Sequence, residues 1–265
     1  MKNRIVKTVI AMVLVVSTVL FTAGFAMNTN VKEKTFKSKD GWSVNYDPST
    51  IKVINGKHST SFIYTGDKTG KNMLTISYKK GVAPEKALDD LTAGWGNTAN
   101  ISKGESYFPG TNDKWGLWDT LLSKTQGSGI NKNAFAGEFN GGTLVFDFAT
   151  VNSNDASANS AVWQILSQIS DSATYDSFAP QTMYAGYAGV YTMNGVELIN
   201  GQRVPVTYTV TLDADHQGTV KLGGDVQYVM WGSHSLIQAD NSFDYNTDGH
   251  TLNLNVDGNW LTFTK

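Results

Sequence analysis

Almost every patterned stretch of this 265-residue chain alternates apolar and polar residues, and only two stretches have helical spacing. Alternation of this kind predicts half-buried β-strands, because successive side chains on a strand point to opposite faces. One helical stretch begins at Pro84, a residue suited to a first helical turn, and the other ends near Ile169 with Asp155 or Ser157 as its cap. Both stretches lie in the first two thirds of the chain. We therefore predict an α+β protein whose C-terminal part is all β.

The N-terminal part, residues 39–172, mixes strands with these two helices. Trp42, Val44 and Tyr46 alternate with polar residues, and Asp47-Pro48 then ends that strand because proline cannot donate to a sheet ladder. Further strands are predicted at 51–54, 61–65, 74–78, 106–108, 115–123, 133–139 and 144–148. Asn140-Gly141-Gly142 lies between the last two strands, so we expect a hairpin turn there.

Residues 173–182 show no periodicity and contain Ser, Thr, Asp and Pro180, so we interpret them as a linker. Beyond the linker, in residues 183–265, the stretches 207–212, 252–256 and 261–264 alternate, with Thr and Asn as the polar partners. Asn-Gly, Gly-Gly and Asp-Gly pairs interrupt the alternation at short intervals. Short strands separated by such turns predict an antiparallel meander.

Residues 1–26 have the composition of an export signal. Lys2, Arg4 and Lys7 precede an apolar run that is too short for a comfortable membrane span, and small residues follow it. An uncleaved anchor is the alternative. Three of the 21 basic residues and none of the 23 acidic ones lie in this segment, so the mature protein has 18 basic residues and a net charge of −5. We expect a secreted or extracytoplasmic protein with a Lys-rich leader at 27–38 and no membrane span after cleavage.

Composition excludes several classes of function. The chain has no cysteine, which rules out disulfides, thiol nucleophiles, thiolate metal sites and lipid attachment at a cysteine. Charged residues make up only 17% of the chain and the net charge is −2, so there is no electrostatic footprint for nucleic acid. At 40% hydrophobic residues, the chain has enough apolar side chains to build packed cores.

The opening motif Ser38-Lys-Asp-Gly-Trp-Ser-Val-Asn-Tyr-Asp-Pro48 and the order of elements after it resemble the PsbP-like fold. This fold is shared by the extrinsic photosystem II subunit and the Ran-binding import factor Mog, and the resemblance covers about residues 38–172. It implies an α/β/α sandwich around an antiparallel sheet, and adaptor or assembly roles without catalysis. No binding motif of either protein is present, so no functional residue is carried over.

The C-terminal part resembles a lipocalin-like half-barrel of exported bacterial proteins. The resemblance rests on Ala188-Gly-Val-Tyr191, His216-Gln-Gly-Thr-Val220, Tyr228-Val-Met-Trp231 and Leu261-Thr-Phe263. Residues 183–265 amount to about half of what a closed eight-stranded ligand-binding barrel requires. We therefore expect a half-barrel without a deep apolar pocket.

Catalytic motifs are lacking. The four histidines share no metal-ligand spacing, and no His-Glu-x-x-His, Gly-x-Ser-x-Gly, phosphate-loop or dinucleotide motif occurs. Ser233 and His234 are adjacent, but neighbouring strand residues face opposite sides, which argues against a working pair. A carboxylate pair for glycoside hydrolysis remains open, because such pairs are distant in sequence, although nothing marks a particular Asp or Glu.

Asp213-Ala-Asp215-His-Gln-Gly218 places oxygen-bearing side chains alternately before a glycine, which makes Asp213 and Asp215 weak candidates for binding a hard cation. A full calcium loop needs more carboxylates and a later bidentate Glu, where this chain has Lys221. A polar hairpin turn is the interpretation we prefer, and no metal or other cofactor is expected.

Aromatic residues are the other candidates. Tyr107, Trp115 and Trp118 cluster in one segment, and Trp231 begins a turn. Exposed aromatic rings stack on sugars or anchor protein partners. Trp115 and Trp118 are three residues apart and face opposite sides of a strand, so packing competes with binding and one of the two belongs to the core.

These observations favour an exported, non-enzymatic binding or assembly protein that acts on an unknown protein or cell-surface partner. The alternative is a small-ligand carrier or weak hydrolase with its pocket in or beside the meander. A cavity of about 300 Å³ or more with convergent polar groups would favour the alternative. An exposed apolar patch would favour the first. The oligomeric state is left open.

Overall fold

A seven-stranded antiparallel sheet is the centre of the N-terminal part of the computed structural model, which describes residues 33–96, 100–124, 127, 129–239 and 241–265. The predicted signal segment 1–26 lies outside the described residues. The strands of this sheet, in spatial order, are β3 (Ile51–Asn55), β4 (Ser59–Tyr64), β5 (Met73–Lys80), β9 (Gly142–Val151), β8 (Ile130–Phe139), β7 (Trp115–Leu121) and β6 (Ser102–Tyr107).

Two helices cover opposite faces of the large sheet. Helix α2 (Pro84–Thr92), extended by a short 3₁₀ turn at Ala93–Trp95, packs Ala87 and Leu88 against Val145 of β9. Helix α3 (Ala156–Asp171) packs against the other face, where Phe146 and Phe148 of β9 point. The alternation along β9 therefore supplies both cores, which confirms the expected α/β/α layers.

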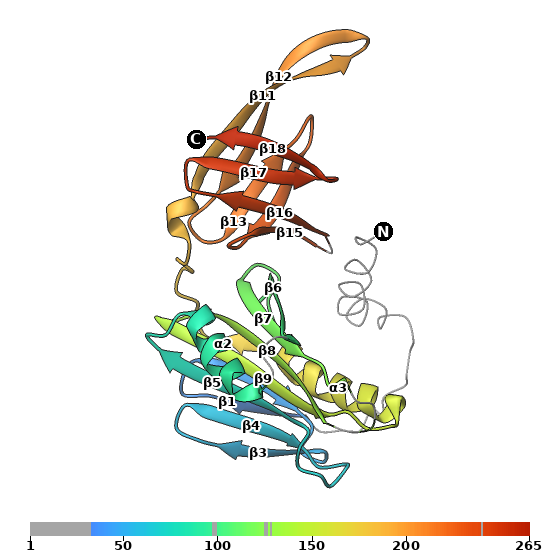
Figure 1. Ribbon diagram of the computed structural model, residues 1–265. Coiled ribbons are helices and arrows are strands. Elements are labelled where there is room, and N and C mark those ends of the chain that lie inside the picture. Colours follow the sequence, from blue (N-terminus) through green and yellow to red (C-terminus); the bar gives the residue numbers. More distant parts are fainter. Residues whose placement is uncertain (1–32, 97–99, 125–126, 128, 240) are drawn as a thin grey trace. The chain divides into compact units, whose positions relative to one another are not determined.

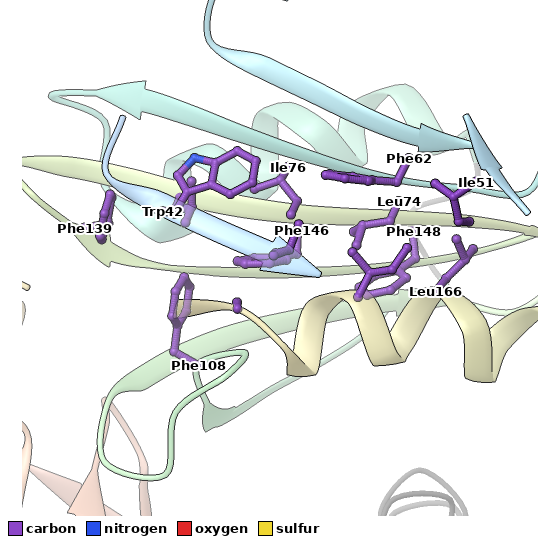
Figure 2. Close-up of a cluster of buried hydrophobic side chains, with 14 of the residues drawn as sticks. Trp42, Ile51, Phe62, Leu74, Ile76, Phe108, Phe139, Phe146, Phe148 and Leu166 are labelled. Carbon is purple, nitrogen blue, oxygen red and sulfur yellow. The ribbon is translucent and has the colours of Figure 1, made fainter. Parts of the chain in front are cut away.

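A second, small sheet lies on the α3 side. It consists of β1 (Lys34–Lys37), β2 (Trp42–Tyr46) and β10 (Thr174–Tyr175), and β1 falls in the stretch expected to be a leader. Trp42 and Val44 of β2 enter the core with Phe62, Leu74 and α3. Figure 2 shows this core, with Leu166 of α3 near Phe148 and Leu74. The core buries aromatic and aliphatic side chains, which is the main source of the sandwich's stability.

Local signals in the sequence locate the turns and caps well. Asn140 and Gly141 connect β8 to β9 and both have positive φ, as the hairpin prediction requires. Asp155 caps α3, because its carboxylate accepts a hydrogen bond from the Ala158 N–H at 3.0 Å.

Eight antiparallel strands form a closed barrel in the C-terminal part (Figure 1). They are β11 (Gly189–Ile199), β12 (Gln202–Leu212), β13 (Gln217–Lys221), β14 (Val226–Trp231), β15 (Ser235–Gln238), β16 (Asn241–Thr247), β17 (Thr251–Val256) and β18 (Asn259–Thr264). The meander is confirmed, but the expectation of a half-barrel was wrong. Pairing of Thr192 with Thr264 joins the first strand to the last.

Large side chains fill the inside of this barrel. Tyr191, Trp231, Tyr245 and Phe263 are fully or almost fully buried there, together with aliphatic residues from most of the strands. A small barrel packed in this way has a core where a ligand-binding barrel has a cavity. The expectation of no deep pocket rested on an open half-barrel, whereas the structure has a closed barrel whose interior is filled by side chains.

The stretch interpreted as a linker is held against the sandwich. Its first residues form β10, which pairs with β2, and Phe178 packs edge-on against Phe108 and Phe139. Gln181 is fully buried. As a result, Glu33–Lys265 forms one compact unit. None of the helices in the described part of the chain is long and apolar enough to cross a membrane.

Candidate functional site

His216 lies between two tryptophans where β12, β7 and β14 meet. The histidine is in the β12–β13 turn, Trp115 begins β7 and Trp231 ends β14. The imidazole stacks on Trp115 with a centroid distance of 4.7 Å and an interplanar angle of 6°, and on Trp231 at 4.7 Å and 27°. All three side chains are completely buried. The stack joins a strand of the sandwich to two elements of the barrel.

The hydrogen bonds of His216 define its protonation. Its Nδ1 lies 2.7 Å from the Trp231 carbonyl oxygen, and a carbonyl only accepts, so Nδ1 carries the proton. Its Nε2 has no hydrogen-bond partner among the described residues. Burial lowers the pKa of His216, although the Trp231 carbonyl and the carboxylates of Glu138 and Glu105 act in the opposite direction. The ring is therefore neutral at neutral pH.

A second cluster brings together Glu105, Ser233 and His234. The buried carboxylate of Glu105, on β6, accepts hydrogen bonds from the Ser233 N–H at 2.6 Å and the Ser233 Oγ–H at 2.8 Å. The Ser233 Oγ also lies 2.7 Å from His234 Nδ1. The expectation that strand alternation separates Ser233 from His234 was wrong, because both residues are in the turn between β14 and β15.

This cluster has the residue types of a hydrolytic triad in a different arrangement. A triad places the imidazole between the serine and the acid, with one ring nitrogen for each. Here the same nitrogen, His234 Nδ1, faces both the Ser233 hydroxyl and, at 3.7 Å, the Glu105 carboxylate. The hydroxyl and the N–H of Ser233 are both bonded to Glu105. The carboxylate is thus placed to hold the turn, and the serine proton has no path through the ring to it.

Gly232 makes the close approach of this turn possible. A Cβ at this position would overlap both the Glu105 carboxyl group and the Trp115 indole nitrogen. The Gly232 carbonyl accepts a hydrogen bond from the buried Tyr245 hydroxyl. The turn is therefore fixed on the barrel side by Tyr245 and on the sandwich side by Glu105.

The segment that follows β10 is bound by two further side chains. Glu138 accepts hydrogen bonds from the Thr182 N–H at 2.6 Å and the Met183 N–H at 2.8 Å. The Gln181 side chain accepts from the Trp115 N–H at 2.9 Å and donates to the Trp115 carbonyl at 2.8 Å. Buried polar contacts of this kind fix one geometry, because leaving either partner unpaired is costly.

The four aromatic candidates fall at different levels of burial. Trp115 and Trp231 are completely buried, so neither ring is available to a partner, and Tyr107 is partly buried beside Met230. Trp118 is half-buried, and its indole occupies the space over Gly104 on the neighbouring strand. Trp115 is thus the member of the Trp115–Trp118 pair that belongs to the core.

The sequence analysis did not identify His216 or Glu105 as residues of the site. Sequence reasoning considered the turn that carries His216 for its aspartates, and a lone Glu on a strand gives no signal. Asp213 and Asp215 are both exposed in this turn, where the Gln217 N–H donates to Asp215 at 3.3 Å and the Asp213 N–H donates to the Gln217 carbonyl at 2.8 Å. Among the described residues, no group of three or more His, Cys, Asp or Glu is arranged to hold a metal ion.

A different kind of site lies on the outside of the barrel. Among the described residues, five large apolar side chains of β11 and β14 are between 51% and 79% exposed, and we call them the outer apolar face: Val190, Val196, Leu198, Val226 and Tyr228. The strand registers place Val190 and Tyr228 in one row, with Thr211 and Thr219 between them. Val196 and Leu198 continue the same face of β11, because they are an even number of residues from Val190.

Two surface hollows lie on the sandwich side. One, of about 190 Å³, is lined by β1, β2 and the β3–β4 turn. The other, of about 370 Å³, is lined by residues 81–84, 138–142 and part of 179–183. Among the described residues that line the larger hollow, the only charged one is Glu138, whose carboxylate accepts hydrogen bonds from the Thr182 and Met183 N–H groups. This hollow reaches the size expected of a ligand pocket, but its charged lining residue is already paired with backbone groups.

No protein-family model and no curated protein sequence matches the chain. Among solved structures, the chain is similar to the solution structure of cyanobacterial PsbP (CyanoP) from Synechocystis sp. PCC 6803, with 12% sequence identity and a TM-score of 0.37. The match covers 57% of this chain and 95% of that one.

Proposed function

We propose that this chain is an exported, non-enzymatic binding or assembly protein that contacts a protein or cell-surface partner through the outer apolar face of its barrel. The observation that carries the proposal is a set of exposed apolar side chains that point outward from β11 and β14, on one face of the barrel wall with threonines between them. Exposed apolar side chains on a protein surface favour contact with a partner, because covering them removes apolar area from water.

Two further assignments belong to the same proposal. We group the sandwich with the PsbP-like folds on its opening motif Ser38–Pro48 and its element order, and the barrel with the lipocalin-like domains. Export rests on the composition of residues 1–26. A small-ligand carrier is less well supported, because side chains fill the barrel and the larger hollow has no free charged group.

Site-directed photo-crosslinking tests the proposal. We expect a photoreactive phenylalanine derivative at Tyr228 to crosslink to a partner when the protein is expressed in its own organism and the envelope and secreted fractions are examined. The same probe at Asn246, an exposed position on β16, is the control. Discrete adducts from Tyr228 and none from Asn246 support the proposal. Equal labelling at both positions, or none at either, contradicts it.

A weak hydrolase is the second candidate, because Ser233, His234 and Glu105 do touch. We expect the purified protein to hydrolyse p-nitrophenyl acetate no faster than the Ser233→Ala variant, since the imidazole does not lie between the serine and the acid. Ser242→Ala, at an exposed serine of β16, is the control. A loss of ten-fold or more in Ser233→Ala alone would establish the hydrolase and displace our proposal.

A further inference from the structure

The β11–β12 hairpin extends beyond the strands on either side of it (Figure 1). Strand β11 pairs with β18 only at Thr192, and β12 pairs with β13 only from Thr209 onward. From Asn194 to Thr207, the hairpin therefore has no neighbouring strand on either edge within the described part of the chain. We call this stretch the arm.

The register of the arm shows which backbone groups point outward. Ile199 and Gln202 flank a two-residue turn, Asn200-Gly201, in which both residues have positive φ, so they form a hydrogen-bonded pair. Bonded and non-bonded pairs alternate in an antiparallel ladder, which makes Val196–Pro205 a non-bonded pair, as a proline requires. The outward N–H and C=O groups of β11 are therefore those of Asn194, Val196 and Leu198.

The two edges of the arm differ. On β12 the outward positions are Arg203, Pro205 and Thr207, so the middle one has no N–H to donate and the first carries a charge. Proline and charged side chains are the usual means by which an edge strand avoids pairing. On β11 no proline blocks the edge, the backbone groups of its one charged residue, Glu197, point toward β12, and Val196 and Leu198 are 61% and 73% exposed. Only the β11 edge is ready to accept another strand.

A second copy of the same edge is a suitable partner. If two β11 edges meet antiparallel with Val196 opposite Val196 of the second copy, each Asn194 lies opposite a Leu198, and each of these pairs exchanges two backbone hydrogen bonds. Glu197 then lies opposite Gly195, so the like charges of the two copies are not opposed. The row through the centre contains only Pro205 and Val196 from each copy, which gives a continuous apolar strip.

We propose that two copies of this chain associate through the β11 edges of their arms, as a four-stranded antiparallel sheet in the order β12–β11–β11–β12. The two-fold axis of such a sheet is perpendicular to it, so the outer apolar faces of both copies lie on the same side. The proposal concerns the edge of the arm and does not depend on the proposed function, which concerns its face.

Proline substitutions on the two edges test the proposal by sedimentation of the purified protein over a range of concentrations. Val196→Pro removes an outward N–H of β11, and Thr207→Pro is the matched control on β12. We expect the wild-type protein and Thr207→Pro to dimerise with similar dissociation constants, and Val196→Pro to dimerise at least ten-fold more weakly. A wild-type protein that is monomeric throughout, or a Val196→Pro dimer as tight as that of the control, overturns the proposal.

A crosslinking measurement covers the case in which a proline variant fails to fold. The chain has no cysteine, so a single introduced one reports only its own position. We expect Val196→Cys to form a disulfide-linked dimer under mild oxidation and Thr207→Cys to remain monomeric. No dimer from Val196→Cys, or equal dimer from both, overturns the proposal. Because these tests use the purified protein alone, their failure is separate from failure of crosslinking at Tyr228.

Discussion

His216 combines features that a turn residue rarely needs. Its backbone is left-handed, with φ of 67°, a conformation that glycine adopts at the lowest cost. Its ring is nevertheless completely buried between Trp115 and Trp231, with one nitrogen bonded and the other without a partner among the described residues. The stacking of the imidazole on two tryptophans from different parts of the fold therefore offsets the conformational cost of the left-handed backbone at His216.

This arrangement predicts a pH dependence of stability. The pKa of His216 is lowered by burial from the ordinary histidine value of 6.5, so the unfolded chain binds more protons than the folded one at pH values between the two. The neutral His216 ring therefore contributes fully to the free energy of unfolding above pH 6.5. This contribution is lost as the pH falls from 6.5 through the pKa of the folded state. We expect the free energy of unfolding of the wild-type protein, measured in urea, to decrease as the pH is lowered over this interval. In His216→Phe the decrease should be smaller.

The matched control for this prediction is His250→Gln, because His250 is exposed. We expect this variant to keep the wild-type pH profile. His216→Phe also loses the hydrogen bond to the Trp231 carbonyl, which contributes about 0.5–1.5 kcal/mol at neutral pH. The comparison therefore depends on the slope with pH and not on the absolute stability. Identical slopes in His216→Phe and the wild-type protein would show that His216 is not the titrating group.

At the scale of elements, the sequence predicted those features that depend on neighbours along the chain. The alternation in Trp42–Tyr46, the Asn140-Gly141 turn and the Asp155 cap are all local, and the structure confirms them. Ser233 and His234 were misplaced because residues 232–234 connect two strands, whereas the sequence argument applied strand alternation to them. Strand alternation does not apply inside a turn.

Closure of the barrel was not predictable in the same way. It depends on one pairing, Thr192 with Thr264, between residues that are 72 apart in the sequence. The expectation of a half-barrel rested on the length of residues 183–265, which is enough for eight strands when several connections are short. Asn200-Gly201 and Asp257-Gly258 each connect two strands with two residues of positive φ, so most of residues 189–264 are left for strands.

At the scale of the whole molecule, the sandwich and the barrel were expected to fold as separate bodies joined by a linker. The contacts that join them come from residues far apart in sequence, such as Glu105 with Ser233 and Trp115 with His216, and no local pattern encodes these pairs. Together with the buried Gln181, they unite Glu33–Lys265 in one compact unit. Sequence periodicity finds the two cores but not the contacts between them.

Buried contacts of this extent predict cooperative unfolding. We expect calorimetry to show a single thermal transition for the whole protein, because the stack of Trp115, His216 and Trp231 cannot be separated without exposing three buried rings. Trp115→Ala should lower the free energy of unfolding by about 3–5 kcal/mol, as for other large-to-small changes at fully buried aromatic residues. Trp118→Ala, on the same strand but half-buried, is the matched control and should cost clearly less. If the two bodies were independent, the wild-type protein would show two transitions, and Trp115→Ala would shift only the one that belongs to the sandwich.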